Sequence, residues 1–167
     1  MRLFTCQELQ LVRQATQQAA YLVSCFYCLA PREWTMLRYE VKTQEELTIN
    51  ERLDTVLAQV LCYQYTCKIN QKIEYKDLYC ICLQDTKILN TFNNIEGDLF
   101  NLLLYVLTHE LVHVVRFGQQ LQRIDLAIEE RNKEEEKVEI ITETILSKQV
   151  NYLTQIPLTK IKSSCLL

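Results

Sequence analysis

The sequence predicts a helix-rich α+β domain, and three observations support this prediction. Glycine and proline are scarce, with 2 of each in 167 residues, which favours long helices over the many tight turns of an all-β fold. Several stretches repeat apolar residues every three or four positions, as amphipathic helices do. Residues 77–83 instead concentrate residues typical of a β-strand. At 49% hydrophobic, residues 1–167 are expected to form one compact domain.

Residues 1–70 are expected to form an N-terminal helical segment. Residues 6–29 place apolar side chains near one helical face: Leu9, Val12, Ala15, Ala19 and Leu22. Residues 30–34, which include a proline, are expected to turn the chain, and residues 37–41 to form a short extended piece. Asn50 is expected to cap a second helix that runs to about Tyr65.

The second half of the chain is expected to hold a small sheet and two long helices. The strand at 77–83 is expected to turn at Gln84 and Asp85 into a second strand over 86–89. Asp98 can cap the next helix and Gly118 can end it. A last helix is expected over residues 128–146, where apolar and small side chains mark one face: Val138, Ile141, Thr142 and Ile145.

The two histidines of the chain lie four residues apart in the apolar helix, as His109 and His113, and Glu110 follows the first. Residues at this spacing share one helical face, so two imidazoles can converge on one metal ion. Glu110 can then reach a metal-bound water and act as general base. Buried charged groups are costly unless they are paired or bind metal. The alternative is two ordinary helical histidines with Glu110 in a local hydrogen bond.

A third protein ligand is needed to complete a catalytic zinc site. No histidine remains, so a carboxylate or a cysteine thiolate must supply it. The apolar face of the 128–146 helix, extended back by one turn, directs Glu134 and Glu135 inward. The alternative is that these acids are surface charges paired with Lys133 and Lys137.

Residues 106–115 resemble the extended signature of zincin metallopeptidases, which has uncharged residues around the two histidines and a hydrophobic residue after the second. Residues 135–139 resemble the glutamate-helix motif of gluzincins, the thermolysin-like zincins, with Val138 in place of alanine and Glu139 in place of aspartate. The resemblance extends over about residues 75–150. It implies a minimal gluzincin-like catalytic unit, with a small β-sheet packed on the HExxH helix and the glutamate helix.

This resemblance implies a site in which His109, His113 and Glu135 hold one catalytic Zn²⁺, with Glu134 as the alternative third ligand. Glu139, one turn after Glu135, would support a ligand imidazole.

The implied activity is zinc-dependent hydrolysis of peptide bonds, with Glu110 as general base. A peptide or protein substrate would pair with an edge strand of the sheet. Tyr152 is a candidate for stabilising the oxyanion.

Three other functions compete with a peptidase. The first is a non-catalytic metal-binding or regulatory helical protein with a zincin-like site. The second is a peptide deformylase that uses Cys80 or Cys82 as third ligand, although the other motifs of that family are absent. The third is a di-iron protein, which needs two ExxH motifs and is excluded because both histidines are already used.

The net charge and the cysteine content limit the remaining classes of function. The net charge of −3 gives no basic surface for nucleic acid. No signal peptide or membrane-spanning stretch is expected, which favours a cytoplasmic protein. The 8 cysteines are then expected to be free thiols that pack as small apolar side chains. A second metal site or a disulfide is the alternative, and the oligomeric state is left open.

Overall fold

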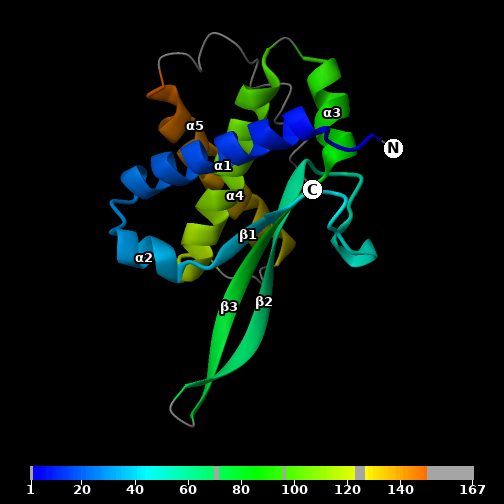
Figure 1. The fold of residues 1–167 in the computed structure, drawn as a ribbon. Coiled ribbons are helices and arrows are strands. Elements are labelled where there is room, and N and C mark those ends of the chain that lie inside the picture. Colours follow the sequence, from blue (N-terminus) through cyan, green and yellow to red (C-terminus); the bar gives the residue numbers. More distant parts are fainter. Residues whose placement is uncertain (1, 70–71, 96, 123–126, 150–167) are drawn as a thin grey trace.

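The structure is a computed structural model, and it describes residues 2–69, 72–95, 97–122 and 127–149. Within these ranges the fold is α+β and helix-rich, as predicted (Figure 1). Its α-helices are α1 (Cys6–Phe26), α2 (Pro31–Met36), α3 (Asp85–Asn93), α4 (Leu99–Gly118) and α5 (Ile128–Ser147). Its strands are β1 (Tyr39–Lys42), β2 (Ala58–Ile69) and β3 (Lys72–Leu83), and a short 3-10 turn, η1, spans Ile49–Glu51.

The three strands form one mixed sheet in the order β1-β3-β2. β1 runs parallel to β3, and β2 runs antiparallel to it. Ile81 sits at the centre of the sheet, between Val41 of β1 and Val60 of β2. β2 and β3 are 12 residues each, so their far ends extend beyond the helices as a two-stranded arm (Figure 1).

Helix α4 is the centre of the core, with α1 and α5 packed against it. The residues of β3 alternate between two faces, as the pleat of a strand requires. Tyr79, Ile81 and Leu83 belong to the main core, which contains the apolar residues of α4. Cys80 and Cys82 belong to a separate small cluster on the other face. Each fully buried aliphatic side chain contributes about 1.5–3 kcal/mol, so α4 is the main source of stability.

The ends of α4 are fixed by local chemistry. The side chain of Asp98 accepts a hydrogen bond from the Phe100 backbone N–H at 3.0 Å, which satisfies one free donor of the first turn. At the other end Gly118 lies against Leu37, and a Cβ at this position would collide with the Leu37 side chain. The close approach anchors the C-terminal end of α4 to the segment between α2 and β1.

Several sequence predictions are confirmed. α1 begins at Cys6 as expected, and its buried residues include Val12, Ala15 and Ala19. β3 contains the predicted strand at 77–83, and β1 overlaps the predicted extended piece. α4 has the predicted cap and end, and α5 covers the predicted glutamate helix.

The helix predicted from Asn50 to about Tyr65 is wrong, because η1 and β2 occupy this stretch. Residues 1–70 are therefore not a purely helical segment. The apolar residues Val56, Leu57, Val60 and Leu61 fit helical spacing as well as a buried strand, and short apolar runs cannot be assigned by spacing alone. The decisive factor is long-range: every residue from Ala58 to Ile69 pairs with β3.

Two shorter predictions also fail. Residues 86–89 were expected as a strand but lie in α3, where Ile88 and Leu89 are buried on one face. The predicted turn at 30–34 is mostly helix α2, which Pro31 begins. Proline fits the first helical position because the N–H that it lacks has no partner there.

The expectation that no stretch reaches membrane-spanning length is corrected by α4. Its 20 residues have a window of mean hydropathy 1.2 and are long and apolar enough to cross a membrane. However, 83% of that window is buried inside the fold, and the central helix of a protein core has the same composition. The hydropathy of α4 is therefore weak evidence for a membrane span.

The fold predicts a large effect at Asp85, the first residue of α3. Its buried carboxylate accepts hydrogen bonds from the backbone N–H groups of Phe4 (3.1 Å) and Gln44 (2.8 Å). Asp85→Ala leaves both donors without this acceptor, and each such loss costs about 1–3 kcal/mol. We expect the free energy of unfolding in urea to fall by about 2–6 kcal/mol. Asp54→Ala, at an exposed position, is the control and should change it by less than about 0.5 kcal/mol.

Candidate metal centre

Three buried or half-buried side chains converge between α4 and α5. His109 and His113 are each 6% exposed, and their Nε2 atoms lie 3.3 Å apart. Oε2 of Glu135, which α5 supplies, lies 3.3 Å from Nε2 of His109 and 3.4 Å from Nε2 of His113. The structure thus brings together the two histidines of the motif and the glutamate predicted to join them.

The spacing of these three atoms fits a tetrahedral metal ion. Zinc binds histidine nitrogen and carboxylate oxygen at about 2.0–2.1 Å, so two ligand atoms of a tetrahedral site lie about 3.3–3.4 Å apart. All three separations in the cluster fall in this range. The donor set, two imidazoles and a carboxylate, also suits zinc, and it leaves a fourth position for water.

Hydrogen-bond geometry indicates which histidine nitrogens are available. Nδ1 of His113 lies 3.1 Å from Oε1 of Gln122, and an amide oxygen only accepts, so this nitrogen carries the hydrogen. Nε2 of a neutral His113 then presents a lone pair toward the centre of the cluster. Nδ1 of His109 is buried and has no hydrogen-bond partner among the described residues. Nε2 of this His113 tautomer and Oε2 of Glu135 are then two acceptors 3.4 Å apart, which need a cation or a proton between them.

The pKa shifts agree with a site that attracts positive charge. Burial works to raise the pKa of Glu135, but the hydrogen bonds with both histidines outweigh it and hold this pKa far below its usual range. Burial also works to lower the pKa of His113, and the contacts with Glu135 raise it above the ordinary value. In both cases the interaction within the cluster is stronger than the effect of desolvation.

Glu110 lies beside the cluster and is 7% exposed. Burial raises its pKa, and the two histidines partly oppose this effect. A carboxyl group with a raised pKa is suited to accept and return a proton near neutral pH.

Glu134, the alternative third ligand, has a different partner. Its carboxylate lies 2.5 Å from Nη2 of Arg116 on α4 and also contacts Lys137. The side chains of Arg116 and Glu134 are each only 12% exposed. This ion pair fixes the position of α5 against α4 at Glu134, the residue before Glu135. It therefore positions Glu135 toward the histidines.

The remaining predicted site residues have varied outcomes. Glu139 is half-buried on α5, and its support of a ligand imidazole stays a prediction. Gln122, which lies after α4 and which no sequence motif marked, contacts the imidazole of His113. Tyr152 lies outside the described residues. Cys80 and Cys82 belong to another cluster and are not grouped with the histidines.

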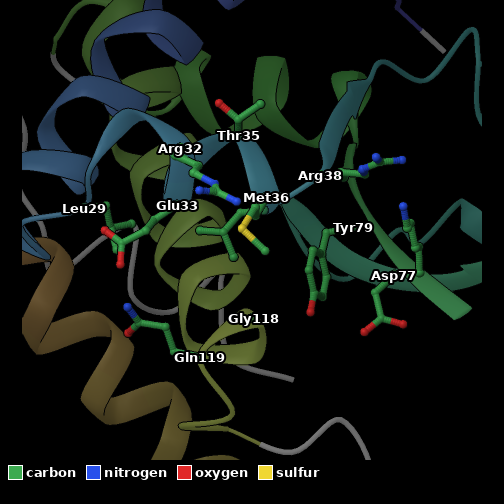
Figure 2. Close-up of a pocket in the computed structure, with 12 residues that line it drawn as sticks. Leu29, Arg32, Glu33, Thr35, Met36, Arg38, Asp77, Tyr79, Gly118 and Gln119 are labelled. Atoms are coloured by element: carbon green, nitrogen blue, oxygen red, sulfur yellow. The ribbon is translucent and has the colours of Figure 1, made fainter. Parts of the chain in front are cut away.

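A pocket of about 610 Å³ lies near the C-terminal end of α4 (Figure 2). Its walls include Arg32 and Met36 of α2 and Tyr79 of β3. Tyr79 stacks on Phe117 with ring centroids 6.1 Å apart, and Phe117 stacks on His113 at 5.9 Å. The three candidate ligands do not line this pocket. Stacked aromatic rings connect the pocket to the metal-ligand cluster.

Comparisons of the chain with protein-family models, with curated proteins and with solved structures found no match.

The site geometry predicts a stabilising role for Arg116. Arg116→Met leaves the buried Glu134 carboxylate without its α4 partner, and breaking a buried ion pair costs about 3–5 kcal/mol. We expect a loss at the lower end of that range, because Lys137 still contacts Glu134. Urea unfolding measures the loss. Lys137→Met is the matched control, since Lys137 is 58% exposed and an exposed pair contributes about 0–1 kcal/mol. Equal losses in the two variants would contradict the role assigned to Arg116.

Proposed function

We propose that this protein is a zinc-dependent metallopeptidase of the gluzincin type, in which His109, His113 and Glu135 hold the catalytic ion. The observation that supports this proposal most strongly is the set of three separations of 3.3–3.4 Å between the candidate ligand atoms. These separations match a tetrahedral zinc site. Glu135 on α5 is 22 or more positions from the two histidines on α4, so the fold brings these side chains together. The resemblance of residues 106–115 and 135–139 to the zincin motifs points to the same chemistry.

The proposed chemistry assigns a separate task to each residue. Zinc, when bound, polarises a substrate carbonyl and lowers the pKa of a water molecule. Glu110, with its raised pKa, accepts a proton on its carboxylate and returns it to the departing amine. Gln122 accepts a hydrogen bond from the Nδ1–H group of His113. This bond favours the His113 tautomer whose Nε2 carries no hydrogen. The Arg116–Glu134 pair keeps Glu135 in position.

Access to the site favours a reactive role over a purely structural one. The side chain of Glu135 is 27% exposed, whereas those of the histidines are 7% exposed. The cluster therefore reaches solvent on the Glu135 side, as a catalytic zinc site with an open position requires. In zincins an extended peptide pairs with an edge strand. β1 and β2 are the two edges of this sheet, and β2 packs against α4. We therefore propose β2 as the strand that receives the substrate.

Metal content and activity of single-residue variants test the proposal. We expect one zinc ion to be lost on His113→Ala and on Glu135→Ala, because each removes one of three ligands. Glu110→Gln should keep this zinc and lose activity by a factor of about 10²–10⁴, the usual contribution of a general base. Elemental analysis measures the zinc, and cleavage of a mixed peptide library, followed by mass spectrometry, measures the activity.

Glu136→Ala is the matched control, because Glu136 is the exposed neighbour of Glu135 on α5. It should keep both zinc and activity. Retention of this zinc in Glu135→Ala would refute the ligand assignment. A wild-type protein that binds zinc at this centre and cleaves no peptide would instead be a non-catalytic metal-binding protein.

A further inference from the structure

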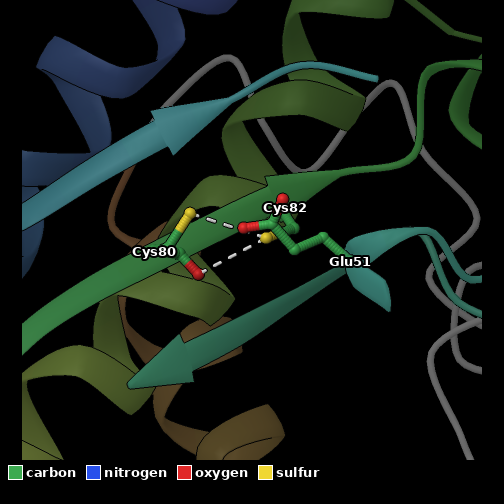
Figure 3. A group of neighbouring side chains, drawn as sticks. All are labelled: Glu51, Cys80 and Cys82. Carbon is green, nitrogen blue, oxygen red and sulfur yellow. Dashed lines mark hydrogen bonds between the residues drawn. The ribbon is translucent and has the colours of Figure 1, made fainter. Parts of the chain in front are cut away.

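A second group of metal-binding side chains lies on the face of the sheet opposite the main core (Figure 3). Cys80 and Cys82 are separated by one residue on β3, so the alternation of a strand directs both thiols to the same face. Both are fully buried, and their Sγ atoms lie 3.6 Å apart. Glu51, from η1, is 2% exposed and faces the two sulfurs. The candidate ligand atoms of all three residues lie within 4.8 Å of one another.

The spacing of the two sulfurs suits a tetrahedral ion. Zinc binds thiolate sulfur at about 2.3 Å, so two thiolates of one tetrahedral site lie about 3.8 Å apart. The observed separation of 3.6 Å is close to this value. Two thiolates and a carboxylate provide three of the four ligands, and thiolates select zinc over hard cations such as magnesium or calcium.

The Glu51 carboxylate is already held in a fixed orientation. Its Oε2 accepts hydrogen bonds from the backbone N–H and the hydroxyl of Thr48, at 2.7 and 2.9 Å. Its Oε1 accepts from the Tyr63 hydroxyl at 2.7 Å and from Nζ of Lys42 at 3.2 Å. Hydrogen bonds of this kind orient ligating carboxylates in metal sites. The carboxylate is therefore ordered before a metal binds, and an ion that reached it would replace one of these four donors.

Charge balance also permits an ion here. Without metal, the negative charge of Glu51 is balanced by Lys42, which lies beside Cys82 across the β1–β3 pair. A divalent zinc ion replaces the two thiol protons when it binds, and the two protons leave to solvent. The total charge of the cluster is the same before and after this exchange. Lys42 thus compensates the site in both states.

We propose that Cys80, Cys82 and Glu51 form a second, structural zinc site that fastens η1 to the sheet. The competing explanation is that the two thiols are small apolar side chains packed with Leu47 and Leu61. The other cysteines that the structure describes are exposed or half-buried, and none of them belongs to a metal-ligand group. The metal site is favoured because the ligand atoms of two buried thiols and a buried carboxylate lie within 4.8 Å of one another, and the two sulfurs have the spacing of two ligands of one tetrahedral ion.

Cobalt substitution tests the second site in the presence of a reductant. The variant His109→Ala/His113→Ala removes the first centre and keeps every cysteine. It should bind one equivalent of Co²⁺ and show a near-ultraviolet sulfur-to-cobalt charge-transfer band, because only thiolate ligands produce this band. Adding Cys80→Ser/Cys82→Ser to this variant should abolish both the binding of Co²⁺ and the charge-transfer band. Cys62→Ser is the matched control, since Cys62 is a half-buried cysteine of β2 that packs with the main core, and it should change neither.

The histidine double variant can overturn the proposal even if the cysteine variant does not fold. A folded double variant, checked by circular dichroism, that shows no charge-transfer band would overturn the second site. Failure of the first centre has a different signature: the Cys80→Ser/Cys82→Ser protein with intact histidines would then bind no zinc. The two metal centres can therefore succeed or fail independently.

Discussion

The burial of polar and ionisable groups inside the most apolar helix is the constraint on which the rest of the structure depends. α4 carries His109, Glu110 and His113 in the middle of the core, all less than 8% exposed. Buried groups of this kind are tolerated only when other groups compensate them. The compensation comes from α5, whose Glu135 lies against both histidines. The position of α5 is therefore tied to the chemistry of α4 as well as to apolar packing.

Two consecutive glutamates on α5 have different roles because neighbouring helical residues point about 100° apart. Glu134 turns toward Arg116, and Glu135 turns toward the histidines. The Arg116–Glu134 pair opposes a shift of α5 by one residue, since either direction would remove Glu135 from the histidines. Val138, Thr142 and Ile145 continue the same buried face toward the core. Apolar contacts place the helix, and the ion pair selects which glutamate reaches the histidines.

The sequence was sufficient to predict features that depend on local patterns and insufficient for those that depend on distant partners. The cap of α4 and the apolar periodicity of α4 and α5 are local, so both helices and the inward direction of Glu134 and Glu135 followed from the residues alone. Residues 58–65 form a strand only because β3 pairs with them, and their apolar spacing equally fits a helix. This error also concealed Glu51, which was placed in a predicted helix. The contact between Gln122 and His113 has no signal in the sequence, because the chain after α4 determines it.

The two candidate centres differ in exposure, and this difference assigns their roles. Cys80 and Cys82 are fully closed to solvent, so no substrate can reach an ion held there, and only a structural role fits. Glu135 is 27% exposed at its side chain, which leaves the first centre open on one side. Residues of β3 alternate between the main core and the thiol cluster, with Ile81 between the two cysteines. An ion at the closed centre would therefore stiffen the strand that packs against α4, and so support the histidine cluster on that helix.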